Sequence, residues 1–368
     1  MKNGNEPGPV PRPGIMEIAP YVGGESHVAG QAKPIKLSSN ESALGPSPKA
    51  RAAYEKAAAE LHRYPDGGAT ALRAALGKAH GLDPTRIVCG AGSDELIALL
   101  ARAYAGPGDE VLYSEHEFLM YPLSALAAGA TPVKVKEKNL TADVDAVLAA
   151  VTEKTRIVFS ANPNNPTGTY LPKAEMRRLR DGLPKRVLLA IDAAYAEFVD
   201  APDYTAGADL VEADGNTVMM RTFSKIYGMG GLRLGWAYCP VAVADVLNRV
   251  RGPFNVSGPA LAAGEAALAD VDFVARQKAL AVEARDWTAK EAAALGLEVT
   301  PSVGNFLLIQ FPAVEGKDAK AADAFLKSRG IIVRRMDRYG LPRALRVTMG
   351  TMDEMKAFVA ALRAFTGK

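Results

Sequence analysis

The sequence predicts an α/β fold, with a large domain built on a mostly parallel sheet flanked by helices and a smaller α/β domain beside it. Apolar strand-like runs alternate with segments of helical spacing between residues 86 and 224, the pattern of a parallel sheet covered by helices. The chain has 368 residues, 48% of them hydrophobic. This length exceeds what a single hydrophobic core usually supports, so two domains are expected. We therefore expect a flexible arm at residues 1–14, a large domain at 45–270, and a small domain formed by 15–44 and 271–368.

The predicted elements follow one another in a simple order. The arm is rich in Pro, Gly and Asn. Residues 48–62 and 69–80 have helical spacing and are separated by the turn RYPDGG. Five strands are then predicted, with helical segments after each of the first three: RIVCG, EVLYS, TRIVFS, RVLLAID and TVMMRTFS. An Ala-rich helix at residues 272–295 leads into the second lobe.

Composition excludes several classes of function. The formal net charge is only +3 and no basic block is interleaved with aromatic residues, so we expect no nucleic acid partner. No apolar leader and no run of about twenty apolar residues is visible, which predicts a cytoplasmic protein without a membrane partner. Cys89 and Cys239 lie in apolar runs and are expected to be buried reduced thiols, with a disulfide as the alternative. No metal site is expected, because the histidines show no metal-ligand spacing: His27, His62, His80 and His116.

Polar residues stand directly after the predicted parallel strands. In open α/β sheets, ligands bind beyond the carboxyl ends of the strands, so these positions are the first candidates for a site. They offer amide, carboxylate, phenol and amine groups: Ser93, Asp94, Asn162, Asn164, Asn165, Asp192, Tyr195, Ser224 and Lys225. Because the strands should lie side by side, these groups are expected to converge at one edge of the sheet.

Each of these residues also has a purely structural interpretation. The segment GAGSDE imitates a dinucleotide-binding loop, but Glu95 replaces its third glycine, so a nicotinamide site is not favoured. The N–H groups at the start of the following helix would still bind an anion. Taken alone, Asp192 could cap a helix, Tyr195 could be a core aromatic residue, and Lys225 could be a surface lysine. Their occurrence at successive strand ends favours a shared site.

One cofactor requires this combination of groups. Pyridoxal phosphate needs a lysine amine for a Schiff base, an acidic partner for its ring nitrogen and an anion cup for its phosphate. Lys225 offers the amine and Asp192 the acidic partner. Arg233, after the glycine-rich stretch, offers a bidentate hydrogen-bond donor for the phosphate. Desolvation and neighbouring cations would lower the pKa of Lys225, so that its amine reacts with carbonyls near neutral pH.

The motifs of the chain resemble those of the fold-type I pyridoxal-phosphate aminotransferases and, within that group, the histidinol-phosphate aminotransferases. The resemblance extends over nearly the whole chain, through the segments APYVGG, LSSNESALGPSP, RYPDGGATALRAAL, GAGSDELI, NPNNPTG, RTFSKIYGMGGLRLG, PFNVSGPA and LRVTMGT. It implies the fold-type I architecture, pyridoxal 5'-phosphate as the cofactor, and a homodimer with shared active sites.

The resemblance also assigns roles around the cofactor. Lys225 matches the Schiff-base lysine and general base, and Asp192 matches the partner of the ring nitrogen. Asn165 and Tyr195 match the pair that binds the ring hydroxyl group, and Phe118 matches an aromatic residue stacked on the ring. The remaining matches surround the phosphate: Ser93, Asp94, Thr222, Ser224, Arg233 and, from the neighbouring subunit, Tyr64.

Arginines of the second lobe are the candidates for binding the substrate. Arg346 matches the arginine that binds the substrate's acidic group, and Arg334 and Tyr21 are further candidates, with Tyr21 expected to reach across the dimer. The alternative is that arginines on exposed strands are merely solvated. Arg335 alternates to the opposite face of its strand and is expected to be structural.

The chain departs from the family pattern at two places. His116 and Glu117 precede Phe118 where the family has Pro-Thr, and Ala193 replaces the glutamate of DEAY. Neither change removes a group that bonds to the cofactor. Because of both changes, however, the family pattern does not predict the shape of the substrate-binding part of the site.

The resemblance implies amino transfer between histidinol phosphate and 2-oxoglutarate, with glutamate as the amino donor in the reverse half-reaction, as part of histidine biosynthesis. The first alternative is an aromatic amino acid aminotransferase acting on phenylalanine or tyrosine, and a more distant one is a threonine-phosphate decarboxylase. A regulatory protein with an aminotransferase-like ligand domain would need a basic DNA-binding segment, which the Pro-rich N-terminus does not supply.

Overall fold

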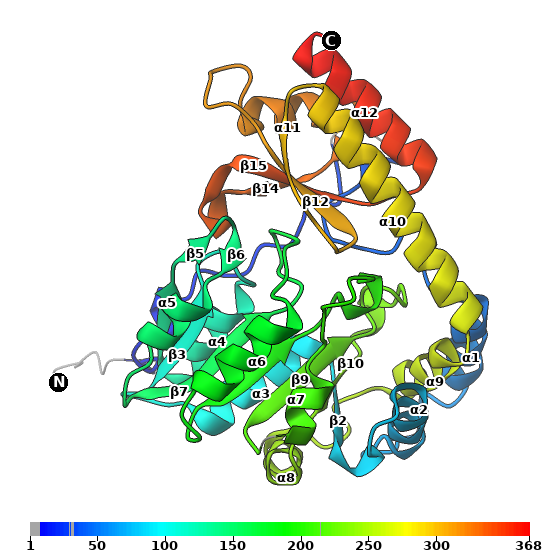
Figure 1. Cartoon of the computed structure of the whole chain (residues 1–368). Helices are drawn as coiled ribbons and strands as arrows, with labels where there is room; N and C mark the ends of the chain where they lie inside the picture. The colour runs from blue at the N-terminus through cyan, green and yellow to red at the C-terminus, as the bar shows by residue number, and fades with distance from the viewer. Residues whose placement is uncertain (1–7, 29, 31–32, 214) are drawn as a thin grey trace, which may run out of the picture.

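The computed structural model describes residues 8–28, 30, 33–213 and 215–368. They form a larger lobe around a seven-stranded sheet and a smaller lobe around a four-stranded sheet, which lies above it in Figure 1. The predicted α/β architecture is confirmed. Residues 1–7 of the predicted arm lie outside the described residues.

The seven-stranded sheet has the order β2-β10-β9-β8-β7-β3-β4. Neighbouring strands pair in parallel, except that β10 is antiparallel to both β2 and β9. All five predicted strands are present. Two further strands were not among them: β10, which lies in the apolar run before Cys239, and β4, whose sequence, TPVKV, carries few buried residues at the edge of the sheet. The bounds are β2 Ile87–Gly90, β3 Glu110–Ser114, β4 Thr131–Val135, β7 Thr155–Ala161, β8 Leu188–Asp192, β9 Thr217–Thr222 and β10 Gly235–Tyr238.

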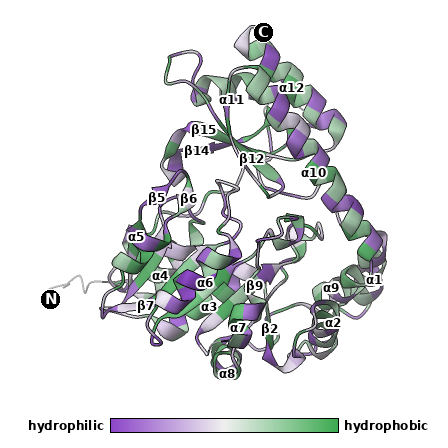
Figure 2. Cartoon of the chain, viewed as in Figure 1, coloured by the Kyte–Doolittle hydropathy of each residue, from purple (hydrophilic) through white to green (hydrophobic). Residues whose placement is uncertain are grey.

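Helices cover this sheet because each buries one apolar stripe. In α6, Met176 and Leu179 are buried, while the charged residues between them give the helix its largely hydrophilic colour in Figure 2. The helix predicted at residues 48–62 starts where expected, with Ser47 as its N-cap, but ends at Ala58. The helices of this part are α1 Pro48–Ala58, α2 Thr70–His80, α3 Ser93–Tyr104, α4 Met120–Ala128, α5 Val144–Ala149, α6 Lys173–Gly182, α7 Ala208–Ala213, α8 Val241–Val250 and α9 Gly258–Leu268.

Short elements connect the larger ones. A small hairpin pairs β5 with β6, and single 3-10 turns lie at several loop positions. Their bounds are β5 Glu137–Lys138, β6 Thr141–Ala142, η1 Ile15–Glu17, η2 Pro84–Arg86, η3 Ala196–Phe198, η4 Gly230–Leu232 and η5 Asp337–Tyr339.

The smaller lobe packs helices against an antiparallel sheet of order β11-β12-β15-β14. Figure 1 shows α10, predicted at residues 272–295, running from the vicinity of α1 and α9 up to this lobe. The bounds are α10 Val271–Ala294, β11 Glu298–Thr300, β12 Phe306–Gln310, α11 Ala319–Ser328, β13 Ile331–Ile332, β14 Arg334–Met336, β15 Leu341–Thr348 and α12 Met352–Thr366.

The N-terminal segment contacts both lobes. Strand β1, Ile35–Lys36, pairs in parallel with β13. This pairing supports the proposal that residues 15–44 join residues 271–368 in one domain while 45–270 form the other. Nearer the N-terminus, Arg12 donates a hydrogen bond to the carbonyl of Ala127 at the end of α4, so that part of the segment lies on the larger lobe.

Candidate functional site

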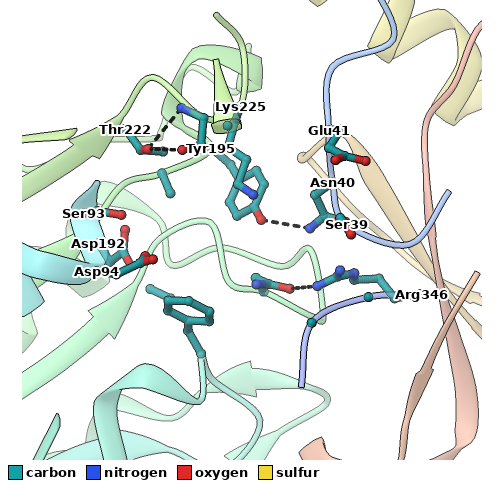
Figure 3. A pocket seen from close by; sticks show the side chains of 18 of the residues that line it. Ser39, Asn40, Glu41, Ser93, Asp94, Asp192, Tyr195, Thr222, Lys225 and Arg346 are labelled. Carbon is teal, nitrogen blue, oxygen red and sulfur yellow. Dashed lines mark hydrogen bonds between the residues drawn. The ribbon is translucent and has the colours of Figure 1, made fainter. Parts of the chain in front are cut away.

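A cavity of about 290 Å³ opens at the carboxyl ends of the parallel strands and reaches the smaller lobe. It is lined by every residue predicted for the cofactor or the substrate except Tyr64: Tyr21, Ser93, Asp94, Phe118, Asn165, Asp192, Tyr195, Thr222, Ser224, Lys225, Arg233, Arg334 and Arg346. Figure 3 shows the groups from the strand ends on one side and Asn40 and Arg346 on the other. The convergence predicted from the strand ends is therefore present for most of these residues.

Two asparagines named at a strand end do not line this cavity. Asn162 exchanges hydrogen bonds with the backbone of Leu171, and Asn164 donates to the hydroxyl of Thr167 at 2.9 Å. Both organise the loop that follows β7, a structural role that is common for asparagine in turns.

Asp192 ends β8, a strand buried along its whole length. Its Oδ2 accepts a hydrogen bond from the phenol of Tyr121 at 3.0 Å. Its Oδ1 is buried and has no hydrogen-bond partner among the described residues. Burial raises the pKa of Asp192 to about 6, against the lowering effect of the Tyr121 hydrogen bond. A carboxylate with one free buried oxygen is suited to accept a hydrogen bond from a ligand.

Lys225 lies just beyond β9, with its Nζ 5.6 Å from the centre of the Tyr195 ring. Burial, helped by the positive charge of Arg346, lowers the pKa of Lys225 to about 8. The lowered pKa that the sequence led us to expect is therefore present before any ligand is considered. An amine with such a pKa is partly unprotonated near neutral pH and can act as a nucleophile.

Asn40 is a site residue that the sequence reasoning missed. Its Nδ2 donates to the phenol oxygen of Tyr195 at 2.8 Å, the bond drawn in Figure 3, and its backbone N–H donates to the hydroxyl of Thr348 at 2.8 Å. The residue takes a positive φ of 55°, which asparagine tolerates better than most side chains. Its only signal was its place in the segment LSSNESALGPSP, far from any predicted strand end.

An anion cup lies where α3 begins beside the residues after β9. Arg233 pairs with Asp94 at 2.9 Å and donates to the hydroxyl of Ser224 at 3.3 Å, while the Thr222 hydroxyl donates to Ser224 at 3.0 Å. At Gly92, which has a φ of 89°, a Cβ would lie 2.2 Å from Arg233 Nη2, so this position requires glycine. Backbone N–H groups, hydroxyls and a guanidinium together favour a phosphate.

The two candidate arginines of the smaller lobe lie side by side. Arg334 on β14 and Arg346 on β15 are direct cross-strand partners. Like charges in that position destabilise a sheet, so the pair is better explained by an anion that binds between them. Arg346 is buried and donates to Asn165 Oδ1 at 2.5 Å and to a backbone carbonyl, while its Nε has no partner among the described residues. Arg335, in line with its predicted structural role, pairs with Asp337.

Tyr21 and Tyr64 lie in contrasting places. Tyr21 lies in the cavity of its own chain, where Arg334 donates to its hydroxyl at 3.4 Å and lies over its ring. The expectation that Tyr21 reaches across a dimer is therefore wrong, because residues 20–22 are held by Arg334 and Arg338 of the same chain. Tyr64 is 83% exposed, lies outside the cavity, and stacks on Phe254 with 4.8 Å between ring centres.

The unusual pair before Phe118, His116 and Glu117, does not line the cavity. Glu117 is buried, and its carboxylate accepts hydrogen bonds from the backbone N–H groups of Ser114 and Ala161, both at 2.9 Å. Burial raises the pKa of Glu117 to about 8. His116 contacts the carbonyl of Tyr339 at 2.6 Å. The departure from the family pattern thus ties the loop that carries Phe118 to β7 and to the smaller lobe.

Other site types have little support in the part of the chain that the structure describes. Within it, no group of three or more His, Cys, Asp or Glu side chains is placed to hold a metal ion. No described helix is both long and apolar enough to cross a membrane. Cys89 and Cys239 are both buried and free.

Comparison with known proteins places this site in a family. A sequence model of the aminotransferase class I and II family matches residues 32–362. The chain belongs to this family, and amino transfer is its class of reaction. It is 61% identical to a histidinol-phosphate aminotransferase of Paramagnetospirillum magneticum, over 98% of this chain and 99% of the relative. It is 60% identical to one of Rhodospirillum rubrum, over 97% of each chain.

Solved structures agree with this placement. The histidinol-phosphate aminotransferase of Sinorhizobium meliloti, solved in complex with pyridoxal-5'-phosphate, has a TM-score of 0.87 and 28% identity, with 96% of each chain covered. An aspartate aminotransferase of Thermus thermophilus, at 21% identity, shares the fold with a TM-score of 0.80, over 90% of this chain and 91% of that one. The predicted fold-type I architecture is confirmed.

Proposed function

We propose that this enzyme uses pyridoxal 5'-phosphate to transfer an amino group between histidinol phosphate and 2-oxoglutarate, in histidine biosynthesis. The observation that carries the proposal is the meeting in one cavity of the Lys225 amine, the free Oδ1 of Asp192 and the arginine pair 334/346. Relatives that share most of their sequence with this chain over nearly their full length are histidinol-phosphate aminotransferases, which supports the same substrate.

The residues of the cavity fit the cofactor. The buried, unpartnered oxygen of Asp192 suits a protonated ring nitrogen, since an unpaired buried acceptor is otherwise costly. Arg233, Ser224 and the start of α3 suit its phosphate, and Lys225 suits its aldehyde. When bound, the cofactor supplies an electron sink that stabilises negative charge at the substrate α-carbon.

The chain's own residues then account for the remaining chemistry. Lys225 Nζ acts as the base that takes the proton from the substrate α-carbon, a role for which its pKa of about 8 is well matched to neutral pH. Asp192 keeps the ring nitrogen protonated. Tyr195 and Asn165 orient the ring hydroxyl group, and Phe118 covers the ring face. We propose these roles on the basis of their positions around the cavity.

The pKa of Lys225 gives a pH prediction. Its nucleophilic form is the free amine, so covalent capture of pyridoxal phosphate by the cofactor-free enzyme should speed up as the pH rises and level off above about 8. At pH 7.5 the free amine should be on the order of 100-fold more abundant than for an ordinary lysine. Stopped-flow absorbance across pH 6 to 10 measures this, and a rate still rising steeply at pH 10 would contradict it.

The arginine pair gives a prediction about the substrate. A guanidinium binds a phosphate or a carboxylate in bidentate fashion. The same two arginines can therefore bind the phosphate of histidinol phosphate in one half-reaction and a carboxylate of glutamate in the other. Arg346→Ala should weaken the use of every substrate. Arg334→Ala should lower kcat/KM for histidinol phosphate by about 10- to 100-fold and for phenylalanine by less, because the phosphate dianion gains more from a second cation.

Arg335→Ala is the matched control for that experiment. Arg335 neighbours Arg334 on the same strand but pairs with Asp337 and does not line the cavity. It should leave kcat/KM near the wild-type value for both substrates. Equal losses in the Arg334→Ala and Arg335→Ala variants would show that Arg334 has no specific part in substrate binding.

We also propose a homodimer in the cytoplasm. Tyr64, which the family resemblance assigns to the neighbouring subunit's cofactor phosphate, projects from its own chain and forms an exposed aromatic pair with Phe254. Such an exposed pair is typical of a surface that a partner covers. The two buried free cysteines support a reducing compartment.

A further inference from the structure

Tyr121 is a buried tyrosine that none of the assigned roles uses. It stands on the first turn of α4 and is fully buried, and its hydroxyl donates to Asp192 Oδ2 at 3.0 Å. Its position, three residues after Phe118, places both side chains on the same side of that segment.

Packing fixes the Tyr121 ring from two directions. It stacks on Phe159 of β7, with 4.7 Å between ring centres and an angle of 5° between the planes. Its other neighbour is Phe118, which meets it edge to face at 5.9 Å. A ring held in this way can place its hydroxyl at one point, and here that point is the Asp192 carboxylate.

We infer that Tyr121 is a positioning residue that holds Asp192 Oδ2, so that Oδ1 alone is presented to the ring nitrogen of the cofactor. This rests on the proposed function. The inference follows from the asymmetry of the carboxylate, in which one oxygen is bonded to the phenol and the other is buried without a partner among the described residues. Without the phenol, the carboxylate would be held less firmly and could rotate away from the ring.

Several groups besides Tyr121 act on the charge of Asp192. Asp94 disfavours its negative charge, whereas Lys225 and a contribution from the Ala194 backbone N–H favour it. The Tyr121 hydrogen bond is the largest of the contributions that lower the pKa of Asp192. Burial in turn raises the pKa of the Tyr121 phenol, so it remains a hydrogen-bond donor. Without it, Asp192 would lose the strongest interaction that stabilises its charged form, and it would bind a proton more readily.

The variant Tyr121→Phe isolates this bond, because it keeps the ring stacked on Phe159 and against Phe118. The cofactor-free variant should bind pyridoxal phosphate about 10- to 100-fold more weakly than wild type. With ¹⁵N-labelled cofactor, NMR should show the ring nitrogen shifted toward its unprotonated position. Tyr170→Phe, which removes a phenol-to-carboxylate bond to Asp203 away from the cavity, should change neither value.

A double-mutant cycle separates positioning through Asp192 from a general structural effect. In an Asp192→Ala background, adding Tyr121→Phe should leave the dissociation constant of the cofactor unchanged. The inference is overturned if Tyr121→Phe matches wild type in affinity and nitrogen shift, or if it weakens binding equally in both backgrounds. Failure of the proposed function would appear differently, as a wild-type protein that does not bind pyridoxal phosphate at all.

Discussion

Replacing Lys225 with alanine should abolish amino transfer, lowering kcat by more than about 10⁴-fold. The substitution removes a general base, worth typically 10² to 10⁴ in rate, together with the covalent attachment of the cofactor. The wild-type enzyme should be yellow, and borohydride reduction should fix the cofactor on the peptide that contains Lys225. Single-turnover kinetics and mass spectrometry of the reduced protein measure both effects.

Lys154→Ala is the control for this substitution. Lys154 is an exposed lysine just before β7, at the end of the sheet opposite to the cavity, so its loss should leave turnover and labelling unchanged. A Lys225→Ala variant that transfers amino groups at the wild-type rate would end the assignment of Lys225 as the catalytic lysine.

Replacing Asp192 with alanine should lower kcat by orders of magnitude. The bond between its carboxylate and a protonated ring nitrogen is charge-assisted and buried, and such bonds contribute about 1.5 to 3 kcal/mol to binding. The loss in rate should be larger, because an unprotonated ring is a poor electron sink throughout the reaction. Asp192→Asn should be similarly impaired, since an amide of the same size cannot balance the charge.

The measurement is kcat for both variants after saturation with pyridoxal phosphate, with thermal unfolding as a check that they fold. If Asp192→Ala keeps more than a small fraction of the wild-type activity, then Asp192 only stabilises the chain after β8, which is the structural interpretation that its sequence position also allows.

The core of the site was predictable because parallel strands end at one edge of a sheet. Asp192 and Lys225 follow strands that are recognisable as apolar runs, so the sheet topology alone brings them together. The pairing of Arg334 with Arg346 could not be predicted in this way, because it depends on the register of β14 against β15 across a separate turn. The sequence indicated both arginines but not that they face each other.

Other parts of the site could not be read from local patterns. Asn40 reaches Tyr195 from a loop with a positive φ, and no periodicity places such a residue. Tyr121 looks like any aromatic residue on an apolar helix until its hydrogen bond to Asp192 is seen. Tyr21 was predicted to lie in the site of the neighbouring subunit, whereas it lies in the cavity of its own chain. Local patterns could not show this, because the contact with Arg334 links positions over three hundred residues apart.

Steady-state kinetics on a panel of amino donors is the most direct test of the proposed reaction. With 2-oxoglutarate as the acceptor, the purified enzyme should use histidinol phosphate with the highest kcat/KM, because its phosphate meets both Arg334 and Arg346. Phenylalanine and tyrosine should show weaker but detectable turnover, with their rings beside Tyr21. Efficient use of phenylalanine without activity on histidinol phosphate would contradict the proposed substrate and favour an aromatic amino acid aminotransferase.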